Sequence, residues 1–554
     1  MRIWTGRAGS GKTTAILQEI AALCAQGEGR QVLLVPELNS HRMERRLAAA
    51  TGNHGARTAE VLTFSRLADR VFSEVGGLAQ QMLTPAGQLL TLQEAARRVQ
   101  GGLSVWNGLA DKPELLKEAL RLIDECKTCA IAPEALFAAS EECEDAALAG
   151  KLGDLAQLLT AYERLCDESL PDPRDRLTHL RDRLGECHVL DGAAVYLDGF
   201  LGFTPQELAV IDAMLAAGVQ LAAAITCDMA YPEIFVTGCK TVKTLTRMAK
   251  RHNKTAQQID LGASKIVRPA GLAAVESESL LPVRTPHEDA HGVHLYAAAS
   301  PFDECEHAAA YIRRKVRDEG ARYRDFVVAA RDIEPYSAFL AMAMARYDVP
   351  VFLAEKPDLL SRPPMALVTG ALDAAQSYFQ YEDLFGCLKT GLTSLTRDEV
   401  DKLENYALTW NIRGGAWERD WTEHPDGYGL PFDDRSRAQL TELNELRARA
   451  IAPFSALREA LKGENPASDC VRALYGFLLA VDAPGRMSAR AAAHEAAGRL
   501  QLADEYRQLW EILVSAMEQF AWVCGDTPLT AERFAQLFRL VLGEYDVGTI
   551  PVSL

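Results

Sequence analysis

The chain has 554 residues, 48% of them hydrophobic and 24% charged, with a formal net charge of −17. This length exceeds what one hydrophobic core supports, so we expect roughly three or four domains. The negative charge disfavours a protein that coats nucleic acid non-specifically, although it leaves room for a local basic channel. The longest apolar stretches, such as residues 210–225, contain polar side chains and fall short of the ~20 apolar residues of a membrane span. No signal peptide pattern begins the chain, and we predict a cytoplasmic protein without membrane contact.

Strand and helix patterns alternate at the amino terminus. We expect a short strand over residues 2–5, a glycine loop over 6–11 and a helix from 13 to about 26. The continuous apolar run at 31–36 and the strand-then-helix pattern at 60–72 extend the alternation. Such alternation is typical of an α/β domain with a parallel sheet.

Two long helical stretches interrupt the α/β pattern. Helical periodicity occupies about 86–190, and strand patterns return at 193–198 and 220–226. The aperiodic stretch 262–292 is typical of a linker. A second α/β unit follows, in which VHLYAAAS, DFVVAAR and VPVFLA are predicted strands separated by two helices.

The end of the chain and the domain boundaries follow from the same patterns. After about residue 376 the chain is helical, and its last residues read as the start of another strand, so we expect a truncated piece of a longer protein. The predicted domains are residues 1–85 with 190–261 as the first α/β domain, 86–189 as its helical insertion, 262–292 as a linker, 293–375 as the start of a second α/β domain, 376–545 as a second helical insertion, and 546–554 as a return to the second domain.

A phosphate-binding motif follows the first predicted strand. GRAGSGKT, from Gly6 to Thr13, fits G-x-x-x-x-G-K-[ST] between a strand and a helix, the context in which backbone N–H groups and a helix N-terminus hold phosphates. Lys12 is expected to reach the β- and γ-phosphates of ATP and Thr13 to ligate Mg²⁺. A tight glycine turn with a solvated lysine is the alternative. The predicted ATP-binding residues are Gly6, Gly9, Ser10, Gly11, Lys12, Thr13 and Thr14.

Asp198 is the predicted second Mg²⁺ ligand. It ends the apolar run YLD at the carboxyl end of a strand, where nucleotide sites form in parallel sheets. A helicase-type motor carries a glutamate at the next position, whereas this chain has Gly199, which can neither accept a proton nor orient water. We therefore predict nucleotide binding without efficient hydrolysis and assign no catalytic residue. A simple turn after a strand is the alternative for this pair.

Several segments together resemble known helicases. VLLVPELNSHRMERRL, VLTFSRLADRVF, YLDGFLGFTPQEL and DFVVAARDIEPYSAFL are similar to motifs of superfamily 1A DNA helicases of the UvrD and RecB type. The ordered set GRAGSGKT, LVPE, FSRLA, DGFLGFTPQE, VPVFLAEKPDLLSRP and LENYALTWNIRGGAW most resembles the AddB family over essentially the whole chain. This resemblance implies a P-loop NTPase fold with two RecA-like domains, each carrying a helical insertion.

The resemblance also implies a function. An AddB-type chain is a subunit of a bacterial helicase–nuclease for recombinational repair of DNA double-strand breaks, in which an AddA-type partner is the motor. It would bind ATP and single-stranded DNA and scan for a Chi-like hotspot, with weak or no motor activity of its own. The nuclease domain and its iron–sulphur cluster are expected only in a carboxy-terminal part outside these 554 residues. An autonomous superfamily 1 helicase and a P-loop kinase or regulatory NTPase are the alternatives.

Polar residues after the second and third strands are the candidates for DNA contact. They follow strands that end at one sheet edge, and they are Asn39, Ser40, Thr63, Ser65 and Arg66. Helix capping and a surface arginine are the alternative. The resemblance places the hotspot-reading positions near Leu38, Ser40, Arg66 and Asp69. Chi-reading members can carry an amide side chain near the first of these positions and an aromatic one near the last, whereas this chain has Leu38 and Asp69. Phe64, Phe200 and Phe203 either stack on bases or pack in the core.

Overall fold

The computed structural model describes residues 1–55, 57–79, 81–168, 170–278, 285–353 and 359–545. The chain forms two compact units. Unit 1 comprises Met1–Met82, Arg121–Thr160 and Cys166–Leu295, and unit 2 comprises Leu83–Leu120, Ala161–Leu165 and Tyr296–Leu554. Within the described ranges, no helix combines the length and apolar character that crossing a membrane requires.

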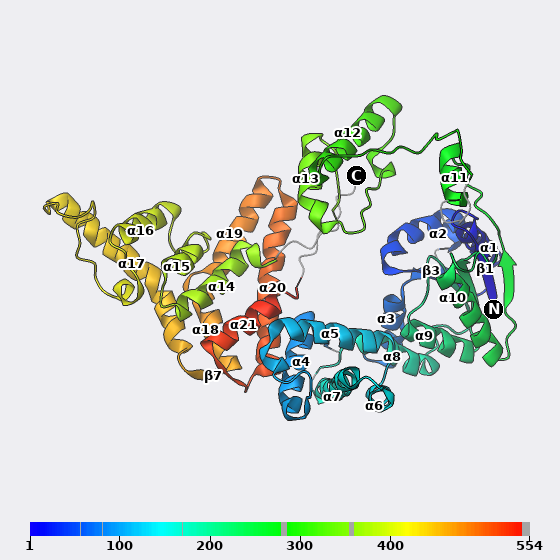
Figure 1. Ribbon diagram of the computed structural model, residues 1–554, viewed down its shortest axis with the longest axis horizontal. Coiled ribbons are helices and arrows are strands. Elements are labelled where there is room, and N and C mark those ends of the chain that lie inside the picture. Colours follow the sequence, from blue (N-terminus) through cyan, green and yellow to red (C-terminus); the bar gives the residue numbers. More distant parts are fainter. Residues whose placement is uncertain (56, 80, 169, 279–284, 354–358, 546–554) are drawn as a thin grey trace. The chain divides into compact units, whose positions relative to one another are not determined.

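A six-stranded parallel sheet organises unit 1 (Figure 1). Its order is β3-β2-β4-β5-β1-β6, and every neighbouring pair is parallel. The strands are β1 (Arg2–Gly6), β2 (Arg30–Leu34), β3 (Ala59–Leu62), β4 (Ala193–Leu197), β5 (Gln220–Thr226) and β6 (Gln257–Asp260). The first five confirm the predicted strands. Edge strand β6 was not predicted, because its sequence QQID has no apolar run and is mostly exposed.

Helices cover both faces of this sheet. Alternate residues of each strand point to opposite faces, as Ile3 and Trp4 do when they join different core clusters. Trp4 packs with α1 (Lys12–Gln26) and α2 (Ser40–Gly55). The cluster of Ile3 includes residues of four other helices, namely α3 (Phe64–Val75), α8 (Arg176–Arg183), α9 (Pro205–Ala216) and α10 (Val236–Arg251). The sheet is therefore buried on both sides, as its apolar strands require.

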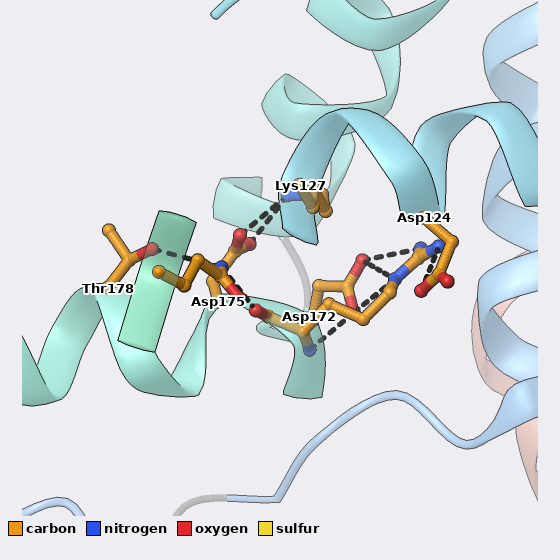
Figure 2. Close-up of polar contacts among 7 residues, drawn as sticks. Asp124, Lys127, Asp172, Asp175 and Thr178 are labelled. Atoms are coloured by element: carbon orange, nitrogen blue, oxygen red, sulfur yellow. Dashed lines mark hydrogen bonds and ion pairs between the residues drawn. The ribbon is translucent and has the colours of Figure 1, made fainter. Parts of the chain in front are cut away.

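A group of charged residues, of which Lys127 and Asp172 are buried, fixes the end of α5 (Pro113–Thr128) within unit 1 (Figure 2). We call Asp124, Lys127, Asp172, Arg174 and Asp175 the ion cluster. The ammonium of Lys127 donates to both carboxylate oxygens of Asp175, at 2.8 and 2.7 Å. Arg174 donates from Nη2 to Asp172 at 2.6 Å and lies 3.8 Å from Asp124. The cluster therefore ties α5 to the 3₁₀ turn Pro173–Asp175 that precedes α8.

The predicted linker is not wholly irregular. Residues Ala270–Glu278 form α11, a helix that was not predicted within the aperiodic stretch 262–292. The alanines of AGLAAVESE favour a helix, and Gly271 lies where a Cβ would come within 2.6 Å of the Ala290 backbone. Tertiary contact with the returning chain selects this helix, which the weak sequence pattern did not indicate.

Unit 2 is mainly helical and has a large aromatic core. The core includes Phe379, Trp417, Phe454, Phe520 and Phe538. Helix α14 (Pro363–Gln376) lies at the end of the segment predicted as the start of the second α/β domain. The helices of the predicted second insertion are α15 (Tyr381–Leu388), α16 (Arg397–Thr409), α17 (Asp434–Ala460), α18 (Ala467–Ala480), α19 (Ala483–Ala496), α20 (Leu500–Cys524) and α21 (Ala531–Leu542). One departure from the helical prediction is the antiparallel pair β7 (Glu464–Pro466) and β8 (Pro528–Thr530).

The predicted strands of the second α/β unit do not form ladders. The structure assigns no strand to residues 293–300, 325–331 or 349–353, whereas α12 (Pro301–Glu319) and α13 (Ser337–Arg346) form as expected. A strand needs hydrogen-bonded neighbours, and the apolar residues Leu295 and Val327 here are 99% and 89% exposed. The strand prediction for these segments is therefore wrong in this structure, and the predicted strand at 546–554 lies outside the described residues.

Candidate nucleotide-binding site

The loop between β1 and α1 presents an open helix N-terminus. Gly9 and Gly11 adopt φ of +79° and +95°, in the left-handed region that favours glycine. Gly11 is the N-cap of α1, and neither a capping side chain nor an acidic residue occupies its first turn. The first amides of a helix have no intrahelical partner, so this end is suited to an anion. The Thr14 side chain is exposed, so we expect Thr14 to contribute its backbone N–H to the phosphate site.

Lys12 lies buried beneath this loop. It is 8% exposed, and its ammonium donates to the carbonyls of Gly6 at 2.8 Å and Arg7 at 2.9 Å. Burial lowers the pKa of Lys12, and the charge of Asp198 opposes this shift. An ammonium has three N–H donors. Within the described ranges two of those of Lys12 are used, so the third is available to a ligand. Ser10 is fully buried, and its hydroxyl has no hydrogen-bond partner among the residues that the structure describes.

Asp198 meets the first turn of α1 although β5 separates β4 from β1 in the sheet. It is 5% exposed and accepts a hydrogen bond from the Thr13 side chain. Burial raises the pKa of Asp198, and the bond from Thr13 is the largest opposing effect. Mg²⁺ at phosphate sites takes one or two carboxylates together with phosphate oxygens and water. The hydroxyl and carboxylate oxygens of this pair therefore fit Mg²⁺, even though the described residues hold no cluster of three His, Cys, Asp or Glu side chains.

Gly199 leaves no acid beside Asp198. Its φ is +84°, and a Cβ built there would lie 3.4 Å from both the Asn39 side-chain nitrogen and a Pro36 ring carbon. A glutamate at this position would have to adopt a strained backbone. The arrangement can thus hold phosphate and metal, but this position provides no group that activates water.

The predicted DNA-contacting residues lie after the neighbouring strands β2 and β3. Two of them also perform local tasks: Thr63 is the N-cap of α3 and accepts from the Arg66 backbone at 3.2 Å, and Ser40 donates to the Glu37 carbonyl at 3.0 Å. Arg66 is half-exposed and pairs with Glu44 at 2.6 Å. Ser65 is exposed. The structure thus brings these residues and Asn39 to one edge of the sheet, and their DNA role stays a prediction.

Core packing accounts for two of the three candidate stacking residues. Phe64 and Phe200 are 6% and 8% exposed and pack edge to face with centroids 5.7 Å apart. They belong to the core beneath α3 and are wrong as open stacking platforms. Phe203 is half-buried against Phe200. Of the other discussed positions, Leu38 is fully exposed and Asp69 pairs with Arg176.

The phosphate loop makes contacts with later segments that were not predicted from the sequence. Arg7 forms an ion pair with Asp228 at 2.7 Å, and its guanidinium lies 5.1 Å from the Tyr231 ring centroid. The Cys227 backbone N–H donates to the Gly6 carbonyl at 3.2 Å. The available signal was that Asp228 follows β5 closely, much as Asp198 follows β4.

Comparisons with known proteins identify relatives of the whole chain. Residues 3–276 match the family described as ADDB, N-terminal. A protein from Acetivibrio thermocellus, named as the B subunit of an ATP-dependent helicase/deoxyribonuclease, is 32% identical over 571 residues, which cover 100% of this chain and 50% of that protein. Proteins of the same name from Desulforamulus reducens (32% identical, 100% and 50% covered) and Thermoanaerobacter sp. (28%, 100% and 49%) match similarly. The chain therefore spans about half the length of these relatives.

Proposed function

The chain belongs to the AddB family, and on that premise we propose that it is part of a helicase–nuclease subunit that binds ATP without efficient hydrolysis. One observation carries the proposal. Lys12, Thr13 and Asp198 lie together at an uncapped helix N-terminus, and Gly199 follows Asp198. The first three side chains are the types that hold a Mg²⁺–nucleotide, and the glycine cannot activate water.

The residues would divide their tasks by chemistry. The free N–H groups at the start of α1 and the Lys12 ammonium would hold phosphate oxygens, while Thr13 and Asp198 would ligate Mg²⁺. Bound Mg²⁺ would supply positive charge between phosphate and carboxylate. Asp198 is desolvated, and a cation beside it would favour its ionised form. The names of the relatives, which include the words ATP-dependent, support this part of the proposal.

We further propose single-stranded DNA as the polymer ligand and an AddA-type subunit as the partner. The names of the relatives, which describe one subunit of a helicase, support a DNA-binding chain that acts in a complex. Asn39, Ser40, Ser65 and Arg66 would hold the DNA backbone at the edge of the sheet, with Thr63 positioning α3. Scanning for a Chi-like sequence, recombinational repair, a cytoplasmic location and an iron–sulphur cluster in the remaining part of the relatives' length belong to the same proposal.

Nucleotide binding and turnover measured side by side test this function. We expect the chain to bind a fluorescent ATP analogue with Mg²⁺, to lose at least about 100-fold in affinity on Lys12→Met, and to hydrolyse ATP slowly with or without single-stranded DNA. Lys250→Met, on the exposed last turn of α10, is the matched control. Rapid DNA-stimulated hydrolysis that Lys12→Met abolishes would contradict the proposal and favour an autonomous helicase.

A separate experiment tests the partner. A full-length version, expressed together with an AddA-type subunit of the same organism, is expected to co-purify with it as a heterodimer. Elution of the two proteins as separate species on size exclusion would contradict this part of the proposal and leave nucleotide binding unaffected.

A further inference from the structure

A segment of the predicted linker lies directly on the phosphate loop. We call residues 262–268 the linker strap. The Arg7 N–H donates to the Gly262 carbonyl, and the Lys265 N–H donates to the Gly9 carbonyl, both at 3.0 Å. A Cβ on Gly9 would lie 2.5 Å from the Ser264 hydroxyl oxygen. The strap is thus hydrogen-bonded to the loop at its first and its middle residue, and its close approach together with the positive φ favours glycine at position 9.

The strap carries a cation to the open end of α1. The Lys265 ammonium lies 3.9 Å from the position that a Cβ on Gly11 would occupy, and Gly11 is the uncapped N-cap of α1. Lys265 is exposed and makes no ion pair with the described residues. Two neighbouring cations are paired, Arg7 with Asp228 and Arg268 with Glu276. Lys265 is therefore a positive charge beside a helix end that is suited to an anion, and no carboxylate of the described ranges pairs with it.

We propose that Lys265 is a second phosphate-binding cation of the nucleotide site, which the linker strap supplies from the exposed side of the loop. This inference rests on the proposed function, and its ligand is the polyphosphate of a nucleoside di- or triphosphate. Lys12 contacts the loop from its buried side, through the carbonyls of Gly6 and Arg7. Two lysines on different sides of one loop would share the phosphate charge, which a single ammonium only partly neutralises.

The neighbouring contacts of the strap hold Lys265 in place. Arg268 donates to the Ser264 hydroxyl at 2.8 Å and pairs with Glu276 of α11 at 3.0 Å. Together with the backbone bond from Lys265 to Gly9, these contacts hold the strap on the loop at Lys265 and on α11 at Arg268. Binding of phosphate by Lys265 would add a further contact between strap and loop, so nucleotide should make the strap more rigid.

Charge variants of Lys265 test the proposal by nucleotide titration. With a fluorescent ATP analogue and Mg²⁺ at low salt, we expect Lys265→Ala to weaken binding about tenfold and Lys265→Glu to weaken it further. Lys265→Arg keeps the charge and should restore most of the affinity. The affinity of Lys265→Ala should also fall less steeply with added salt than that of the unaltered chain. Lys250→Ala is the control and should bind as the unaltered chain does.

Hydrogen exchange supplies a readout besides affinity. Amides of residues 262–268 should exchange more slowly when ATP is added to the unaltered chain, and this protection should be absent in Lys265→Ala. Thermal unfolding of each variant checks that the fold is intact.

The outcomes separate this inference from the proposed function. Unaltered affinity in Lys265→Ala and Lys265→Glu, combined with loss of binding in Lys12→Met, would overturn the role of Lys265 alone. Equal weakening by Lys265→Arg and Lys265→Ala would also overturn it, because the position would then matter for shape and not for charge. Failure of the unaltered chain to bind ATP would overturn the proposed function and this inference together.

Discussion

At two places in unit 1, buried charges have different kinds of partner. In the ion cluster, Lys127 is 6% exposed and is held by both carboxylate oxygens of Asp175. At the phosphate loop, Lys12 is 8% exposed and is held by two neutral carbonyl oxygens. The ammonium of Lys127 therefore contacts a carboxylate of the protein, whereas the ammonium of Lys12 contacts none among the residues that the structure describes.

The buried carboxylates differ in the same way. Burial alone would raise the pKa of Asp172, but the hydrogen bonds and charge of Arg174 outweigh this effect, and the pKa is lowered. Burial also raises the pKa of Asp198, and there the bond from Thr13 and the nearby cations do not reverse the shift. Removing the partner of a buried, paired charge destabilises the fold, because the remaining charge is left uncompensated, whereas a charge buried without a partner keeps a desolvation penalty that a ligand can offset.

The largest expected effect is loss of the carboxylate at the ion cluster. Asp172→Ala should lower the free energy of unfolding by about 3–5 kcal/mol, because it leaves the mostly buried Arg174 without its main counter-charge. Urea denaturation measures this change. The control Asp182→Ala removes a half-exposed carboxylate of α8 and should change stability by less than about 0.5 kcal/mol. Similar values for the two variants would show that the cluster does not stabilise unit 1.

Paired substitution of the two buried lysines tests the comparison directly. Lys127→Met should destabilise the chain by about 2 kcal/mol, since it leaves Asp175 without its cation. Lys12→Met should alter stability by no more than about 0.5 kcal/mol, because the relief of ammonium desolvation offsets two lost hydrogen bonds to carbonyls. Both values come from the same urea titration. A larger loss of unfolding free energy in Lys12→Met than in Lys127→Met would contradict the comparison, because Lys12 would then be the lysine that stabilises the fold.

The dependence of stability on pH should have opposite sign at the two aspartates. The pKa of Asp172 is lowered in the folded state, so this residue stabilises the fold at pH values above its unfolded pKa of about 3.9. That stabilisation is lost as the pH falls through the folded pKa. The raised pKa of Asp198 favours the folded state below about pH 3.9, and that contribution is lost as pH rises through the folded pKa.

Asp198→Asn should therefore increase the free energy of unfolding at pH 7 by about 1 kcal/mol, and by less near pH 4. Urea denaturation at the two pH values measures the difference. The same variant should weaken Mg²⁺-dependent nucleotide binding. Destabilisation at pH 7 would mean that the protein already compensates the charge of Asp198.

The last expected effect concerns the residue after Asp198. Gly199→Ala should cost about 1 kcal/mol, because φ of +84° is strained for a residue with a Cβ. Gly185→Ala is the control, since a Cβ there meets nothing within 4 Å and its φ is not in the left-handed region. A difference within about 0.3 kcal/mol between them, measured by thermal unfolding, would remove backbone strain as a reason for glycine at position 199.

Much of unit 1 could be predicted because its signals are local. The apolar runs of β1, β2 and β4 and the glycine loop are read within a few residues, and the structure has Lys12 at the start of α1 and Asp198 directly after β4. The resemblance to the AddB family, drawn from ordered motifs, is confirmed by the relatives. Composition and periodicity failed at β6 and α11, where the sequence pattern is weak and contact with distant chain decides the conformation.

The sequence by itself determined the phosphate motif, the acid at position 198 and the glycine after it, because each is a chemical identity at a fixed place in the chain. Tertiary structure alone decided that Thr13 bonds to Asp198, that Phe64 and Phe200 are buried, and that Lys265 lies over the loop. Gly9 and Lys265 are hydrogen-bonded although they are far apart in sequence, and no local pattern encodes such a contact. Its physical cause is the parallel sheet, which places β6 beside β1 and so brings the segment after β6 onto the loop that follows β1.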